Sequence, residues 1–229
     1  MKLLHYISIY STLLPILAFV VSRFNRKQKL KWVVFILLLV GVFVDIISYK
    51  LAKKSENTLW LINFFTVVEF TLLCYFFSLL LKLKHSSKII FLSFIFFLIT
   101  WGYFNVLKNN INSFDYRSQA IEFIFLLLFC IMFFFQKTKI SDTIFIYNTY
   151  QFWLVSALLI YCAGTFFSFF IPMSNSEKAR DIIVFEYISR IGNIVKSILI
   201  TIAFCINPAK LSKNRPNPNS IYYIKDLKE

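Results

Sequence analysis

The chain has 229 residues, of which 59% are hydrophobic and 20% aromatic, while only 16% carry a charge. Soluble domains average about 45–50% apolar and about 25% charged residues, so the composition excludes an ordinary water-soluble domain, and its apolar content excludes a disordered chain. The formal net charge of +14 is explained by basic loops that face anionic lipid head groups, so we expect membrane lipids as partners and no nucleic acid.

Apolar residues come in seven stretches of roughly 17–25 residues, each long enough for a helix to cross a bilayer. The stretches cover residues 4–21, 32–49, 59–81, 89–107, 119–135, 149–172 and 182–206. None of them alternates apolar and polar side chains as a barrel strand does. The sequence therefore predicts an all-α polytopic membrane protein, with a seven-transmembrane-helix bundle over residues 1–206 and a mobile basic cytoplasmic tail over residues 207–229. Pro15 is expected to kink the first span.

The positions of Lys and Arg predict how the bundle is oriented. The first stretch lacks a small-x-small cleavage pattern and is followed by five basic residues, which indicates an uncleaved span with its amino terminus outside. Alternation then places the first, third and fifth loops and the tail in the cytoplasm, with fifteen basic residues against eight in the outer segments. We therefore predict a multi-pass protein of the cell inner membrane with its carboxyl terminus in the cytoplasm.

Cysteine and histidine give no sign of a metal centre. The four cysteines all fall within predicted spans, where they are typical of core packing. The only two histidines, His5 and His85, are predicted at opposite faces of the membrane, whereas a catalytic zinc ion needs about three converging protein ligands. We predict no metal, no cofactor and no soluble catalytic module.

Several polar residues are predicted inside the spans, where a charge costs roughly 2.5–3.5 kcal/mol at the bilayer centre. In chain order they are Asp45, Asn63, Glu69, Glu122, Glu186, Arg190, Asn193 and Lys196. With the orientation above, most of them lie in the outer half of the bundle. This distribution predicts a polar cavity that opens outward, and we take these eight residues as the candidate ligand-binding network.

The last span gives the most direct support for such a cavity. At about 100° per residue, Glu186, Arg190 and Asn193 share one helix face. Lys196 lies on the flank of that face and could meet Glu69 if the two spans are neighbours. A structural alternative stays open, because Asp45, Glu122 and Glu186 could reach interfacial water and Glu69 could form an ion pair that only fixes packing.

Short motifs spread over nearly the whole chain resemble one protein family. They are LWL at 59–61, FTVVE at 65–69, YRS at 116–118, IE at 121–122, FW at 152–153 with Tyr161 and Gly164, and NIVK at 193–196 with Ala203. In these motifs the chain resembles an uncharacterised family of seven-helix multi-pass membrane proteins of Bacteroidota. The resemblance implies one membrane domain and no established activity, and it favours Glu69, Glu122, Asn193 and Lys196 as characteristic residues.

The leading functional interpretation is an integral membrane sensor or signal-relay protein. It would bind a small or lipid-like ligand in the outward cavity and pass a helix shift to a cytoplasmic signalling partner. An intramembrane lipid-modifying enzyme is the first alternative, with Glu69 or Glu122 as general base and Lys196 or Arg190 stabilising negative charge. A small channel or transporter, or a membrane-acting effector, is the second. Catalytic residues and the oligomeric state stay unassigned.

Overall fold

The computed structural model describes residues 2–22, 28–83, 85–108, 111–113, 115–139, 149–168 and 178–206. This part of the chain is all helical and contains no strand. The predicted tail over residues 207–229 lies outside the described residues, as do parts of the first and fifth predicted loops. The elements are α1 (Lys2–Ser11), α2 (Leu13–Val21), α3 (Lys29–Lys53), α4 (Leu59–Leu80), α5 (Ser86–Gly102), the π-helix η2 (Tyr103–Leu107), α6 (Tyr116–Lys139), α7 (Tyr150–Ser168) and α8 (Lys178–Cys205).

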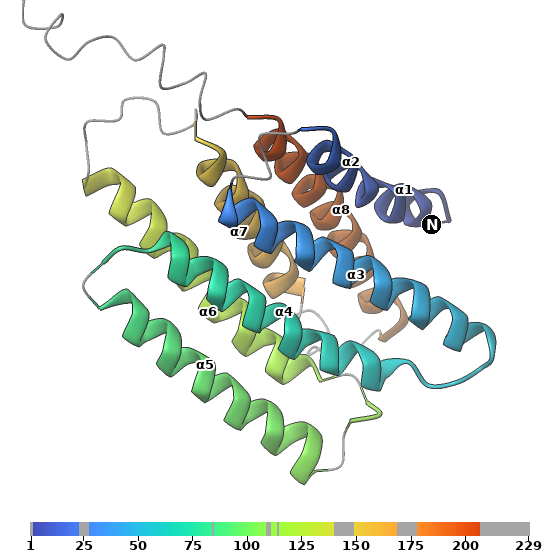
Figure 1. Cartoon of the computed structure of the whole chain (residues 1–229). Coiled ribbons are helices and arrows are strands. Elements are labelled where there is room, and N and C mark those ends of the chain that lie inside the picture. Colours follow the sequence, from blue (N-terminus) through green and yellow to red (C-terminus); the bar gives the residue numbers. More distant parts are fainter. Residues whose placement is uncertain are drawn as a thin grey trace, which may run out of the picture.

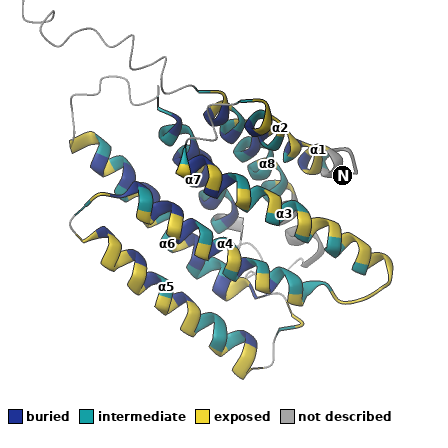
Figure 2. Cartoon of the chain, in the orientation of Figure 1, coloured by how far each residue is buried: buried dark blue, intermediate teal, exposed yellow. Residues whose placement is uncertain are grey.

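Five helical segments are long and apolar enough to cross a membrane: Lys29–Lys53, Leu59–Leu80, Ser86–Leu107, Tyr116–Lys139 and Tyr187–Cys205. Only 22–39% of the residues in their most apolar windows are buried inside the protein. Figure 2 shows the exposed faces along α3, α5 and α6. Water would disfavour apolar surface of that extent, whereas lipid would not. The helices are therefore those of a multi-pass membrane protein. The first and sixth predicted spans correspond to shorter apolar segments, Ile7–Val21 and Tyr150–Phe166.

The first predicted span is divided into two short helices. The division falls at Thr12, one turn before Pro15, which lies in the first turn of α2. Proline has no N–H to donate to the carbonyl of Ser11, four residues earlier, and its ring clashes with that carbonyl in a continuous helix. The hydroxyls of Ser11 and Thr12 instead donate to the carbonyls of Ser8 and Ile9, at 2.7 Å and 2.6 Å. The kink expected at Pro15 is thus a break at Thr12.

The helices form two groups that meet along α6 and α7. In one group α4, α5 and α6 pack together, and α3 lies along α4 (Figure 1). In the other, α7 packs along α8, and α1 and α2 lie against α8. Phenylalanine fills the first group, since the rings of Phe70 and Phe97 lie 4.4 Å apart and those of Phe77 and Phe129 lie 5.4 Å apart. The space between α3 and the α7–α8 pair holds the site described below.

The two ends of the bundle are each held by long-range hydrogen bonds. We call the end at which α8 finishes the C-terminal end, and the end at which α8 begins the N-terminal end. At the C-terminal end, the Lys31 ammonium donates to the Ile206 carbonyl at 2.9 Å, and the Lys82 backbone N–H donates to the Gln136 side chain at 3.0 Å. At the N-terminal end, Asn63 of α4 bonds the loop before α6. Consecutive long helices therefore alternate in direction.

Candidate functional site

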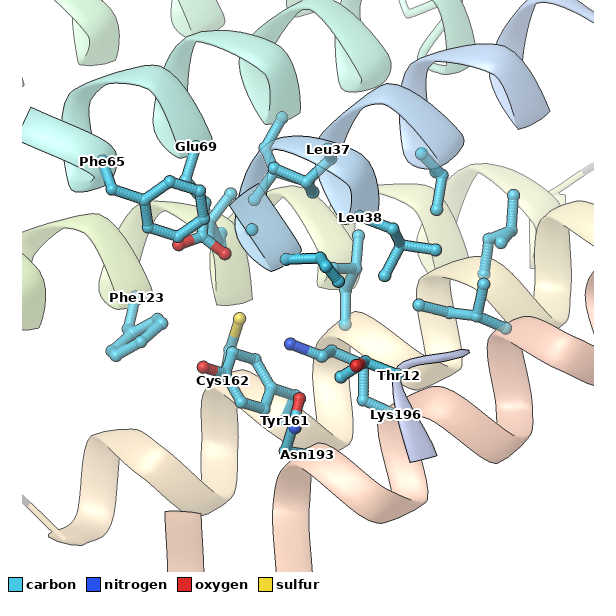
Figure 3. A pocket seen from close by; sticks show the side chains of 18 of the residues that line it. Thr12, Leu37, Leu38, Phe65, Glu69, Phe123, Tyr161, Cys162, Asn193 and Lys196 are labelled. Carbon is cyan, nitrogen blue, oxygen red and sulfur yellow. The ribbon is translucent and has the colours of Figure 1, made fainter. Parts of the chain in front are cut away.

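A cavity of about 250 Å³ lies between α3 and the α7–α8 pair (Figure 3). Residues of α4 and α6 also line it. Its apolar lining includes Leu37, Leu38, Leu126 and Leu158. Seven polar residues also line it: Thr12, Asp45, Glu69, Tyr161, Cys162, Asn193 and Lys196.

Helical periodicity explains why these side chains share one cavity. On α7 the lining residues include Leu154, Leu158 and Cys162, each four positions after the last. On α4 the lining residues Phe65, Glu69 and Leu73 follow the same spacing. Residues four apart lie on one helix face, so each helix presents a single stripe to the cavity.

Lys196 brings the cation of the site. Its Nζ lies 3.7 Å from the centroid of the Tyr161 ring, close enough for a strong cation–π interaction. Gly192 lies one turn earlier on α8 beside that ring, and a Cβ at this position would make an ordinary contact of 3.7 Å with Tyr161 Cδ2. Figure 3 shows the ammonium directed away from the α8 backbone and into the cavity. Lys196 lies near the middle of the apolar segment Tyr187–Cys205, where a charge is most costly.

Glu69 brings a carboxylate from the opposite wall. It lies halfway along α4, and its oxygens point into the cavity (Figure 3). It is within electrostatic range of Lys196. Within the part of the chain that the structure describes, however, neither Glu69 nor Lys196 has an ion-pair partner. The predicted meeting of spans three and seven is therefore present as two facing charges separated by the cavity.

Asp45 marks where the cavity opens. It lines the cavity from α3, yet its side chain is exposed. It lies about two turns before α3 finishes at Lys53, so the opening is displaced toward the N-terminal end of the bundle. Asp45 is also within electrostatic range of Lys196. An acidic group at the mouth attracts cationic groups and repels simple anions.

Asn193 lines the cavity but is engaged in holding helices together. Its side-chain amide donates to the Ser8 hydroxyl at 3.2 Å and to the Ser8 carbonyl at 3.4 Å. These bonds tie α8 to α1. The neighbouring Thr12, at the break between α1 and α2, lines the same cavity. The broken helix is thus part of the cavity wall.

Glu122 lies beside the cavity rather than on its surface. Its side chain is 2% exposed, and within the described residues its Oε1 atom has no hydrogen-bond partner. It is within electrostatic range of Glu69 and of Cys162. A buried oxygen atom without a hydrogen-bond partner is costly in free energy, so this position is expected to serve a specific purpose.

Two other predicted site residues, Asn63 and Arg190, are not among the residues that line the cavity. Asn63 is buried at the N-terminal end, where its amide donates to the carbonyls of Ile111 and Ser113, both at 2.9 Å. Arg190 is half-buried on α8 and is not among the lining residues. The side chain of Glu186 lies outside the described residues. Of the eight predicted residues, the cavity brings together Asp45, Glu69, Asn193 and Lys196.

Tyr161 and Cys162 are site residues that the sequence did not mark as such. In the sequence, Tyr161 belongs only to the motifs of the family resemblance, and Cys162 is expected in the core. The signal for Tyr161 is a tyrosine in the middle of an apolar segment, because its hydroxyl requires a polar environment. No comparable signal exists for Cys162, whose sulfur faces the cavity in Figure 3.

Comparisons of the chain with protein families, curated proteins and solved structures found no match. The resemblance to a Bacteroidota family therefore stays a prediction. Within the described residues, no cluster of three His, Cys, Asp or Glu side chains is placed to hold a metal ion.

Proposed function

We propose that the chain is a seven-span inner-membrane sensor that binds a small or lipid-like ligand in the cavity between α3 and the α7–α8 pair. One observation carries the proposal: Asp45, Glu69 and Lys196 come from three different helices and line one cavity near the middle of the apolar segments. Ionisable residues at that depth are typical of functional sites. A water-accessible ligand site explains their presence there better than lipid contact does.

The relay step rests on how α3 and α8 are joined. They face each other across the cavity through Asp45 and Lys196, and at the C-terminal end Lys31 of α3 bonds the Ile206 carbonyl after α8. A ligand that draws the cavity walls together would rotate both helices about this contact. Such a ligand shifts the equilibrium only if it binds one arrangement better than the other. The predicted cytoplasmic loops and tail would then present the change to a partner.

The ligand-binding proposal is tested by asking what the protein retains from its own membrane. Native mass spectrometry of the full chain, extracted in polymer-bounded lipid discs, should show a bound small molecule. Leu158→Trp should remove it, because this buried side chain lines the cavity. Ile160→Trp is the matched control, since Ile160 is 46% exposed on the same helix. Equal retention by both variants, or an empty wild-type protein, would contradict the proposal.

A lipid-modifying enzyme is a second candidate. A carboxylate, an ammonium group and a thiol, from Glu69, Lys196 and Cys162, converge on one cavity, and this is the kind of set that general acid–base chemistry uses. An enzyme requires turnover, so incubation with membrane lipids should yield a changed lipid that Glu69→Gln abolishes. A sensor with the same substitution would change ligand affinity only.

The channel alternative has less support from the cavity. Toward the C-terminal end its lining is apolar, with Val34, Leu73 and Ile200. A conducting path needs polar groups that continue to that face. Ion flux in liposomes above background would favour the channel over the sensor.

A further inference from the structure

Two opposite charges face the same cavity without pairing with each other. The Lys196 ammonium lies on the Tyr161 ring and points inward from α8, and the Glu69 carboxylate points inward from α4 (Figure 3). Neither has an ion-pair partner within the described residues. Buried charges in proteins are usually paired or hydrogen-bonded. The arrangement suits a ligand that carries both charges and bridges the two walls.

Three classes of small ligand can be compared against these charges. An anion would satisfy Lys196 but would bring negative charge close to Glu69 and Asp45. A cation would satisfy the two carboxylates but would approach Lys196. A zwitterion satisfies both walls, because its anionic group can accept hydrogen bonds from Lys196 while its ammonium donates to Glu69.

We infer that the cavity binds a small zwitterion with an apolar body, the chemistry that an apolar α-amino acid represents. The inference rests on the proposed ligand-binding function and names the class of ligand. The volume of about 250 Å³ is below the roughly 300–1,000 Å³ of pockets for drug-sized molecules. The ligand therefore has the size of an amino acid or of a lipid head group.

The remaining lining residues match the three parts of such a molecule. The apolar body faces Leu38, Leu126 and Leu158. The ammonium lies on the side of Glu69, with Asp45 at the opening as a second acidic group. The anionic group lies on the side of Lys196.

The same pair of charges occurs in two kinds of molecule. A free apolar amino acid carries an ammonium and a carboxylate, and the head group of phosphatidylethanolamine carries an ammonium and a phosphate. Both would bridge Lys196 and Glu69. The experiment below separates these two sources and also separates the zwitterion from singly charged ligands.

The test uses three molecules that share one apolar body: L-phenylalanine, phenethylamine and 3-phenylpropanoate. Binding of radiolabelled phenylalanine to the full chain in detergent is measured, with the other two as competitors. Each competitor lacks one charged hydrogen-bonding group, so we expect it to bind at least about tenfold more weakly than phenylalanine. Tighter binding of either singly charged molecule would overturn the zwitterion inference.

Variants then assign each charge to its end of the ligand. Lys196→Met should weaken the binding of phenylalanine about tenfold or more. In this variant, phenethylamine and phenylalanine should bind with equal affinity. In Glu69→Gln, by contrast, phenylalanine should no longer bind more tightly than 3-phenylpropanoate. Lys196→Arg keeps the cation and should restore part of the affinity, which a folding defect would not. Lys53→Met and Glu56→Gln remove the same charges from exposed positions and should change nothing.

The lipid arm uses nanodiscs of phosphatidylethanolamine or of phosphatidylglycerol. If the head group is the ligand, phosphatidylethanolamine should raise the melting temperature of the wild type but not of Lys196→Met or Glu69→Gln, and phenylalanine should not bind. Preference for phosphatidylglycerol would overturn the inference. If a singly charged competitor binds and Leu158→Trp blocks it, the zwitterion class is wrong while the cavity remains a ligand site. If no amine, acid, amino acid or lipid binds, the proposed function fails as well.

Discussion

A buried lysine joins three helices at the C-terminal end of the bundle. Lys31 is 0% exposed, and its Nζ donates to the Ile206 carbonyl at 2.9 Å and lies 4.8 Å from the centroid of the Tyr150 ring. Segments far apart in the sequence, in α3, α7 and the end of α8, therefore meet at one side chain. The cation also faces the negative end of the α8 dipole, which favours it there.

Removing the Lys31 ammonium should destabilise the protein. We expect Lys31→Met to lower the free energy of unfolding by about 1.5–3 kcal/mol, because a hydrogen bond from a charged group is lost while the apolar stem is kept. Unfolding by SDS in mixed micelles measures this change. Lys29→Met is the control, since Lys29 is exposed on the same turn. This substitution should lower the free energy of unfolding by less than about 0.5 kcal/mol. Equal costs for the two variants would show that the contact contributes nothing.

Asn63 is a buried polar residue that we expect to stabilise the fold and not to bind ligand. Its amide bonds two loop carbonyls at the N-terminal end, away from the cavity. Asn63→Ala should cost about 1–3 kcal/mol of unfolding free energy, because two hydrogen bonds from a buried amide are lost, and should leave ligand affinity unchanged. Thr71→Val on the same helix is exposed and should have little effect on either quantity. A loss of affinity in Asn63→Ala would return Asn63 to the ligand site.

At the scale of the helix, the break between α1 and α2 shapes the cavity wall. Pro15 imposes the break, and Thr12 at the break lines the cavity. In Pro15→Ala the N–H at position 15 is restored, so we expect one continuous helix through residues 2–21. Labelling of a Thr12→Cys variant from the cavity by a small thiol reagent should then slow severalfold relative to the same variant with Pro15. An unchanged rate would mean that packing against α8, rather than proline, fixes the break.

Helix positions were largely predictable from the sequence, because lipid requires long apolar stretches. The predicted third span, 59–81, is the helix Leu59–Leu80, and the predicted second span, 32–49, extends to Lys29–Lys53. The extension arises because lysine side chains can cover apolar surface with their stems while the ammonium reaches water or a partner, as Lys31 does. A purely apolar criterion misses such ends.

The site was predictable only in part, because periodicity gives the face of a helix but not its neighbour. Periodicity predicts Lys196 on the flank of a polar stripe, and Lys196 lines the cavity. It could not show that α3 rather than another helix lies opposite, which brings Asp45 into the site. Nor could it separate Asn63, which bonds a loop, from Glu69, which faces the cavity. Contacts between helices decide these questions.

The whole molecule combines two fixed ends with an open middle. Lys31 joins α3 to the end of α8, and Asn63 fixes the loop before α6 at the other end. Between these ends, α3 and the α7–α8 pair are separated by the cavity and by facing charges. Motion of α3 relative to α8 would therefore change the shape of the cavity. This is the arrangement that a ligand-driven helix shift requires.

The orientation of the whole bundle in the membrane depends on whether its sixth segment crosses. The sixth predicted span is short, since the 17 residues of Tyr150–Phe166 extend about 25 Å against a hydrocarbon core of about 30 Å. Its start is nevertheless held at the C-terminal end, because the Tyr150 hydroxyl donates to the Gln28 side chain at 3.0 Å. We therefore expect this segment to cross, with the amino terminus outside and the carboxyl terminus inside.

Reporter fusions measure this orientation directly. Green fluorescent protein folds in the cytoplasm and alkaline phosphatase is active only outside it, so the first should fluoresce after Glu229 and the second should be active after Glu56 and inactive after Lys82. An epitope placed before Met1 should be cleaved by protease added to spheroplasts. If Tyr150–Phe166 does not cross, the fusion after Glu229 alone changes side. If the basic residues do not set the orientation, all the reporters reverse, and Asp45 then marks an opening toward the cytoplasm, where a sensor of external ligands could not use it.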